Sequence, residues 1–154
     1  EDFNSVLVAE IPDNNYRWKQ ANFTKTYFEN FFGALPGQND HHRILLRNVQ
    51  SNGLLGTTEV RKTVSVRSQN YRIELGAATG SYPQEGRPIG VFIRISVRDF
   101  IYIIVMPSDN FYQSISHFLS ANYTGPTRQV RRFDTNVAIL RENCPELPLW
   151  NVRS

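Results

Sequence analysis

The sequence predicts an α+β domain in which most of the chain is β-strand and two helices carry apolar stripes. Residues 60–67 and 91–98 alternate apolar and polar side chains with a period of two, which is typical of strands with one buried face. Residues 100–106 are apolar on both faces, which indicates a central strand. Residues 22–35 and 109–122 instead repeat apolar side chains every three to four residues, as one face of a helix does.

The N-terminal third contains strand signals on both sides of the first helix. Residues 5–11 are predicted as a strand, and residues 16–20 as a short strand that leads into the helix at 22–35. Five aromatic side chains line that helix, so we expect it in the core or at a subunit contact, and Pro36 ends it. Residues 44–49 then form a short apolar run that predicts another strand.

A central block of strand-like segments precedes the second helix. Its four segments are residues 60–67, 71–75, 91–98 and 100–106. The loop at 76–90 is glycine-rich and long for a hairpin, so we interpret it as a mobile connection without a phosphate-loop pattern. Ser108 is the predicted N-cap of the helix at 109–122, and Gly125 ends it.

The chain has 154 residues, which is enough for one domain with a substantial core. We expect that domain over residues 1–125 and a C-terminal arm over residues 126–154, which packs on the body or on a neighbouring subunit. Glu1 in place of Met indicates a processed start from which a targeting segment has been removed. No run approaches the roughly 20 apolar residues of a membrane-spanning helix, so we expect no membrane contact.

Charge and arginine usage point to nucleic acid. The chain has a net charge of +3, a pI of about 9.2, and 14 arginines among its 17 cationic residues. Between Glu59 and Arg98, seven cations stand against three glutamates, a local excess larger than the net charge of the whole chain. Arginine presents a rigid fork that matches phosphate oxygens, and a basic sheet face is suited to RNA or a single strand.

The outer faces of the predicted strands supply the candidate contacts. The inner faces are assigned to the core and carry Val60, Val64, Val66, Val91, Ile93, Ile95 and Val97. The predicted phosphate contacts are Arg61, Lys62, Arg67, Arg72, Arg94 and Arg98. The predicted hydrogen-bonding and stacking residues are Thr63, Ser65, Ser96 and Phe92. The earlier strand adds Arg17 and Lys19.

Motifs for catalysis, cofactors or metals do not stand out. No nucleophile elbow, zinc helix or phosphate loop occurs, so we expect no enzyme and no cofactor, although a catalytic pair could still assemble in three dimensions. The single cysteine, Cys144, excludes an intramolecular disulfide. His41 and His42 are adjacent and lack a third ligand nearby, so we expect no metal site.

The order of these segments resembles the second half of a Whirly-type fold. The resemblance spans about residues 5–125 and is carried by Val60-Arg-Lys-Thr-Val-Ser-Val, Gly90-Val-Phe-Ile-Arg-Ile-Ser-Val, Ile101-Tyr-Ile-Ile-Val, a helix and Tyr123-Thr-Gly. The resemblance implies antiparallel β-meanders, each followed by a helix, with the helices packed together. The first unit is incomplete here, because its two opening strands and their Lys-Gly-Lys-type motif have no counterpart.

Within this family, the arginine-rich strands look most like the kinetoplastid mitochondrial guide-RNA-binding proteins. The resemblance implies sequence-tolerant binding of guide RNA on the sheet face, RNA annealing in mitochondrial RNA editing, and a homo- or hetero-tetramer with a related chain. The alternatives are single-stranded DNA binding, as in the plant members, and a protein–protein interaction module with an acidic partner. An enzyme would instead require a deep pocket with a perturbed carboxylate.

Overall fold

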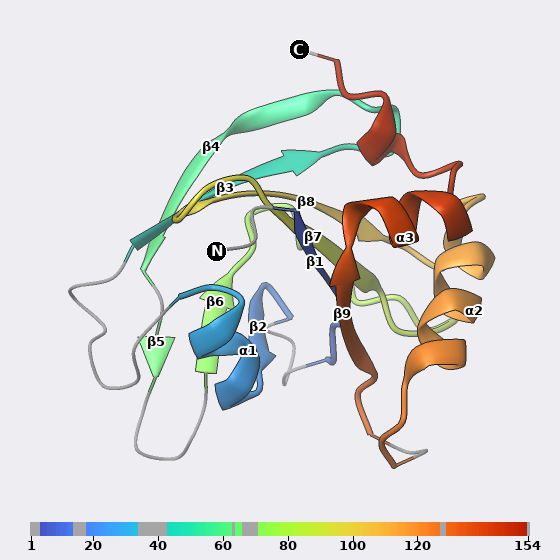
Figure 1. Ribbon diagram of the computed structural model, residues 1–154, viewed down its shortest axis with the longest axis horizontal. Coiled ribbons are helices and arrows are strands. Elements are labelled where there is room, and N and C mark those ends of the chain that lie inside the picture. The colour runs from blue at the N-terminus through green and yellow to red at the C-terminus, as the bar shows by residue number, and fades with distance from the viewer. Residues whose placement is uncertain are drawn as a thin grey trace.

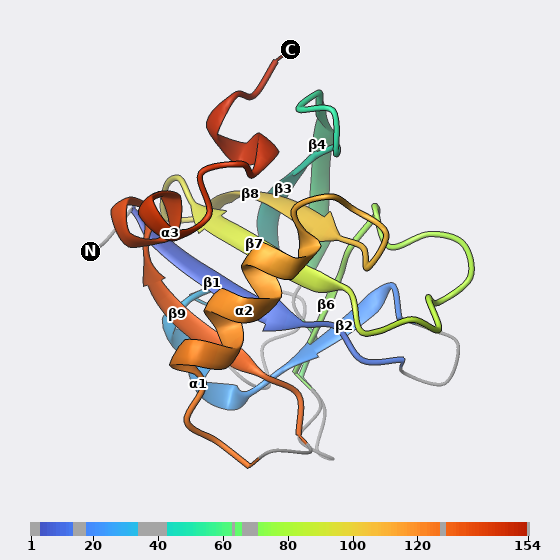
Figure 2. The same cartoon turned by 90° about the vertical axis from the view of Figure 1, so that its right-hand side faces the viewer.

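The computed structural model describes residues 4–13, 18–33, 43–62, 64–65, 71–126 and 129–153, which form two β-sheets and three α-helices (Figures 1 and 2). The α+β class predicted from periodicity is therefore confirmed.

A large mixed sheet forms the centre of the molecule. Among the described residues it has six strands in the order β4 (Leu55–Lys62), β3 (Arg43–Val49), β8 (Asp99–Val105), β7 (Ile89–Arg94), β1 (Ser5–Glu10) and β9 (Arg132–Asn136). Neighbouring strands are antiparallel except for β3 and β8, which pair in parallel with Leu45 opposite Asp99. The parallel pair places the start of β3 beside the turn between β7 and β8.

A small sheet and a short helix cover one face of the large sheet. The small sheet has the order β2 (Gln20–Phe23), β6 (Tyr71–Glu74) and β5 (Val64–Ser65), and α1 (Lys25–Asn30) follows β2. The first helix is shorter than predicted, because residues 20–23 pair with β6 as a strand. The helix begins after Thr24, whose hydroxyl accepts a hydrogen bond from the backbone N–H of Tyr27 at 3.3 Å.

The large sheet separates two hydrophobic cores. One core packs Phe28 and Phe32 from the α1 region against Phe92 and Tyr102 of the sheet. The other core packs the opposite face of the sheet against α2 (Tyr112–Asn122) and α3 (Val137–Asn143). Figure 1 shows α1 with the small sheet on one side and α2 with α3 on the other. The prediction that the two striped helices pack together is therefore wrong, because the central strands are apolar on both faces and need cover on each.

The alternating pattern of residues 91–98 does not continue to its end. β7 ends at Arg94. Its residues Phe92 and Ile93 point to opposite faces and are 0% and 5% exposed, so both faces of the strand are buried. Ile95 and Val97, which were assigned to the core, are 49% and 50% exposed because the chain turns there. Val60 is likewise 57% exposed, contrary to its assignment to the core, since no helix covers that end of β4.

The C-terminal segment packs against the large sheet through β9. β9 pairs antiparallel with β1, with Phe133 opposite Val8, and so forms an edge of the large sheet (Figure 2). Asn136 then caps α3, accepting a hydrogen bond from the N–H of Ile139 at 2.9 Å. A 3₁₀ turn, η1 (Pro148–Trp150), follows α3.

The N-cap predicted for the second helix also differs. α2 begins after Phe111 rather than after Ser108, and the Asp109 carboxylate accepts a hydrogen bond from the N–H of Met106 at 2.8 Å. The chain therefore completes a turn between β8 and α2 before the helix begins.

Candidate nucleic-acid interface

Exposed arginines gather at one end of the large sheet, where β3 and β8 run parallel. The backbone N–H of Leu45 donates to the carbonyl of Arg98 at 2.7 Å, so the β7–β8 turn lies beside the start of β3. Arg43 at the start of β3, Arg47 four residues further along and Arg98 in the turn are all exposed. Arg43 and Arg47 lie on the same face of β3 because side chains alternate along a strand. We call Arg43, Arg47 and Arg98 the arginine surface.

The three arginines of this surface form no ion pair with any residue that the structure describes. Arg47 Nε donates to the carbonyl of Gly56 at 3.2 Å, which orients its side chain and leaves its other N–H groups available. Strand pairing adds a further cationic position, because Lys62 on β4 lies opposite Arg43. These arginines therefore present positive charge that no described carboxylate pairs with at ion-pair distance.

The β7–β8 turn is fixed by hydrogen bonds on both of its sides. The N–H of Ser96 donates to the carbonyl of Asp99 at 3.2 Å, and the Ser96 hydroxyl donates to the Asp99 carboxylate. Arg94 donates from Nε to the Ser96 carbonyl and from a terminal nitrogen to the Val97 carbonyl, each at 3.3 Å. Arg94 therefore closes the turn, whereas Arg98 remains exposed at its edge.

Exposed apolar side chains border the arginine surface. Val60, Ile95 and Val97 are 57%, 49% and 50% exposed. A groove of about 310 Å³ runs beside them between β3, β4 and β8, lined by Leu45, Arg47, Thr58, Ile95, Asp99, Phe100 and Ile101. Exposed apolar groups next to cations are suited to a macromolecular partner.

Arg61 has a different environment from the arginine surface. It lies 3.4 Å from a Glu59 oxygen and 3.1 Å from a Glu74 oxygen, so its charge is neutralised within the fold. Glu59 also accepts hydrogen bonds from the N–H of Gly76 at 2.8 Å and from the hydroxyl of Tyr102 at 2.9 Å. Burial, together with the Glu59 charge, raises the pKa of Tyr102, which keeps this hydroxyl a proton donor.

Arg131 and Arg87 are neutralised by the buried Glu10 of β1. The Glu10 carboxylate is 6% exposed and lies 2.7 Å from an Arg131 nitrogen and 3.2 Å from an Arg87 nitrogen. It also accepts the backbone N–H of Arg131 at 2.8 Å. Burial alone would raise the pKa of Glu10, but the hydrogen bonds and charge of Arg131, with Arg87, hold it below its ordinary value. This cluster joins the residue before β9 to the last residue of β1.

Two of the predicted contacts need correction. Phe92 is fully buried, with its ring centroid 5.6 Å from those of Phe23 and Phe32 and 5.7 Å from that of Tyr102, so it offers no surface for base stacking. Its face of β7 is covered by the small sheet and α1, which the local alternation does not reveal. Arg61 is held by two glutamates and is not an unpaired phosphate contact.

The structure brings three of the predicted residues together and separates others. Arg94, Ser96 and Arg98 meet in the β7–β8 turn. Arg72 lies half-buried on β6 of the small sheet. Lys19 precedes β2, and its carbonyl accepts a hydrogen bond from the N–H of Leu75, just after β6, at 2.8 Å. The backbones of Lys62 and Ser65 lie in β4 and β5, and their side chains lie outside the described residues, as do the whole of Arg17, Thr63 and Arg67.

Arg43 and Arg47 were not among the predicted contacts. Residues 43–49 alternate Arg-Ile-Leu-Leu-Arg-Asn-Val, and this pattern places both arginines on one face. No local signal indicates that β3 pairs in parallel with β8, which is the pairing that brings Arg98 beside them.

The described residues contain neither a metal-ligand cluster nor a helix that could span a membrane. In the described part of the chain, no group of three His, Cys, Asp or Glu side chains is placed to hold a metal ion. The predicted pair His41 and His42 lies outside it. None of the helices with described residues is both long enough and apolar enough to span a bilayer.

Comparison with known proteins bears on the fold. No protein-family model matches the sequence, and no curated protein matches it. Among solved structures, the fold is similar to the N-terminal domain of Helicobacter pylori LlaJI.R1, with a TM-score of 0.57 and 13% sequence identity. The match covers 85% of this chain and 97% of that domain. At this identity, the likeness shows a shared fold alone.

Proposed function

We propose that this protein binds nucleic acid through the arginine surface, with contacts mainly to phosphates and therefore little dependence on sequence. The observation that carries the proposal is the contrast in pairing. Arg43, Arg47 and Arg98 are exposed and have no ion-pair partner among the described residues, whereas Arg61, Arg87 and Arg131 are neutralised by carboxylates.

The spacing of these arginines suits a phosphate backbone. Arg43 and Arg47 are separated along β3 by about 13 Å, since a strand rises about 3.3 Å per residue. A nucleic-acid strand in B-form carries one phosphate per roughly 3.4 Å of helix axis, so this span faces several phosphates. Each guanidinium that contacts a phosphate releases condensed counterions, which is the main source of sequence-independent affinity.

The finer parts of the proposal rest on the sequence resemblance. They are a Whirly-like fold, guide RNA as the ligand, annealing activity in mitochondrial RNA editing, and assembly with a related chain. Phosphate contacts alone do not distinguish RNA from DNA, because that distinction requires contacts to the 2′-hydroxyl. The choice of ligand is therefore left to experiment.

Fluorescence anisotropy with labelled oligonucleotides tests the proposal. Single-stranded RNA, single-stranded DNA and duplex DNA of one sequence would be titrated with the wild type and with R43A/R47A/R98A. A matched control, K25A/R141A/R153A, removes the same charge from exposed positions on α1, α3 and the C-terminal segment. We expect tight binding by the wild type and the control and much weaker binding by R43A/R47A/R98A, whereas equal loss in the two variants would contradict the assignment.

The second candidate function is binding to an acidic protein, and the exposed Val60, Ile95 and Val97 favour it. An apolar rim around a cationic centre is also a common composition for a protein interface. Correctly folded protein that binds none of the three nucleic acids at low salt would support this alternative over nucleic-acid binding.

A further inference from the structure

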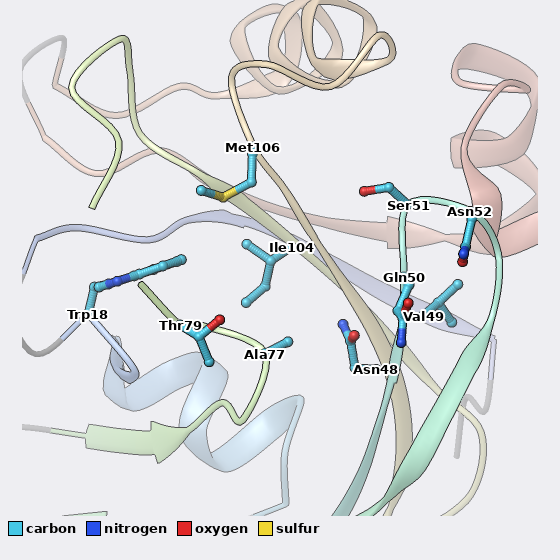
Figure 3. A pocket seen from close by; sticks show the side chains of 10 residues that line it. All are labelled: Trp18, Asn48, Val49, Gln50, Ser51, Asn52, Ala77, Thr79, Ile104 and Met106. Atoms are coloured by element: carbon cyan, nitrogen blue, oxygen red, sulfur yellow. The ribbon is translucent and has the colours of Figure 1, made fainter. Parts of the chain in front are cut away.

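A second candidate site lies toward the other end of β3, at an uncharged pocket of about 470 Å³ (Figure 3). Trp18 stands on one side of it, and Asn48 and Gln50, from the end of β3, stand on the opposite side with Ile104 between them. Asn48 directly follows Arg47 of the arginine surface, and successive side chains of a strand point to opposite faces. Asn48 therefore lines a pocket on the face opposite to Arg43 and Arg47.

One part of the pocket is apolar and rigidly held. Trp18 is 4% exposed, its indole N–H donates to the carbonyl of Gly80 at 3.2 Å, and its ring meets the edge of Tyr82 at 5.6 Å between centroids. Ile104 is 7% exposed, and Met106 also lines this part. These side chains give a planar ligand an apolar surface that does not have to reorganise.

The opposite part carries amide and hydroxyl groups with free hydrogen-bonding capacity. The Asn48 side-chain NH₂ donates to the carbonyl of Tyr102 at 3.4 Å, which orients the amide and leaves its oxygen available. The side chains of Gln50 and Thr79 line the pocket, are exposed and bond to no residue in the described part of the chain. The pocket therefore offers both donors and acceptors.

The residues that line the pocket include no charged side chain. Asp109 is the nearby carboxylate, and it is engaged by the hydroxyl of Ser51 at 3.3 Å and by the N–H of Met106 at 2.8 Å. A phosphate or carboxylate inside the pocket would find no counterion among the described residues that line it, which favours a neutral ligand.

We propose that this pocket binds a nucleobase. A base is neutral and planar, and its edge presents donors and acceptors that Asn and Gln amides match in pairs. The apolar floor of the pocket, formed by Trp18, Ile104 and Met106, suits the faces of a base, and a volume of 470 Å³ lies within the range of small-ligand sites. The base is supplied either as a free nucleoside or as part of a strand, and the chemistry that recognises it is the same.

Tryptophan fluorescence tests this proposal without reference to the arginine surface. Trp150 would be replaced by Phe so that the signal reports on Trp18, and adenosine, guanosine, cytidine and uridine would each be added. A short oligonucleotide containing 2-aminopurine provides the strand-borne arm. Saturable quenching by a nucleoside indicates the free source, and a change confined to the oligonucleotide indicates the strand-borne source; both outcomes support the proposal.

Variants then locate the binding site. N48A/Q50A should weaken binding by about tenfold or more, since two hydrogen-bonding amides are lost. Q50A alone, at an exposed position, should weaken binding less than N48A/Q50A does and should retain the wild-type melting temperature. Q113A, on the exposed side of α2, should bind nucleosides as the wild type does.

The proposal is overturned by either of two results. One is the absence of a saturable signal with all four nucleosides and with the oligonucleotide. The other is wild-type affinity in folded N48A/Q50A. Because nucleosides carry no phosphate, failure of nucleobase binding and failure of phosphate binding are seen separately.

Discussion

The arginines of this protein occupy two kinds of environment, and the difference determines what each can do. Arg61, Arg87 and Arg131 lie within ion-pair distance of Glu59, Glu74 or Glu10, and Glu10 is 6% exposed. The arginine surface lies on solvent-exposed strand and turn positions without such partners among the described residues. The comparison teaches that an arginine count alone does not indicate a ligand; the local carboxylates decide which arginines support the fold.

The largest effect is expected at the Glu10 cluster. Glu10→Ala leaves Arg131 and Arg87 without their carboxylate, and breaking a buried pair by removing one partner costs roughly 3 kcal/mol or more. We therefore expect a fall of about this size in the free energy of unfolding, measured by urea denaturation. Glu142→Ala, at an exposed position of α3, is the control and should change the free energy by about 0.5 kcal/mol or less. A Glu10→Ala protein as stable as the control would break the comparison.

A smaller loss of stability is expected at the Arg61 cluster. Tyr102→Phe removes the hydroxyl that donates to Glu59 at 2.9 Å and accepts the N–H of Ala77 at 3.1 Å. Two partners lose a hydrogen bond in a partly buried site, so we expect a cost of about 2 kcal/mol in the free energy of unfolding. Tyr123→Phe removes an exposed hydroxyl that donates to Pro126, and should cost much less. Equal costs would show that the Glu59 network does not stabilise the fold.

The Glu10 cluster should also make the stability of the protein depend on pH. The pKa of Glu10 in the folded protein is below its ordinary value of 4.5. The cluster therefore contributes stability that is present above about pH 4.5 and is lost as the pH falls through the folded-state pKa. Chemical denaturation between pH 7 and about pH 3 should show a shallower acid loss for Glu10→Gln than for the wild type. Parallel curves would contradict this role of Glu10.

The smallest effect on stability is expected at the arginine surface. Val97→Glu places a carboxylate beside Arg98 at a position that is 50% exposed, so the free energy of unfolding should change by about 0.5 kcal/mol or less. Its affinity for nucleic acid should nevertheless fall about fivefold, because one charge is worth about 1 kcal/mol near a surface. Val152→Glu, at a 38% exposed position, adds the same charge away from the surface and should bind as the wild type does.

Local periodicity predicted the elements better than their partners. Four elements follow from their own local patterns, and the structure confirms them: the strands near residues 5–11, 44–49 and 100–106 and the helix that ends at Asn122. The parallel pairing of β3 with β8 and the addition of β9 to β1 depend on contacts distant in the sequence. These pairings convert a predicted meander and arm into one mixed sheet.

The candidate site shows the same limit at the level of single residues. The alternation around Phe92 indicates two faces but does not say that a second layer covers the face assigned to solvent. Arg98 was predicted from the alternation of residues 91–98, whereas Arg43 and Arg47 became candidates only once the β3–β8 pairing placed β3 beside the turn that contains Arg98. The pairing of Arg61 could not be assigned from sequence. Glu59 is only two residues away, but Glu74 reaches Arg61 from the neighbouring small sheet, and this approach depends on how the two sheets pack.

The salt dependence of binding shows whether Arg43, Arg47 and Arg98 contact phosphates. Anisotropy titrations of the preferred oligonucleotide at several salt concentrations give the slope of log K against log salt for the wild type, R43A/R47A/R98A and K25A/R141A/R153A. Each lost phosphate contact makes the slope less negative by about 0.7 to 0.9, so we expect a difference of roughly 2 to 3 for R43A/R47A/R98A and little change for the control. A slope equal to that of the wild type in folded R43A/R47A/R98A would contradict the claim that these three arginines bind phosphate.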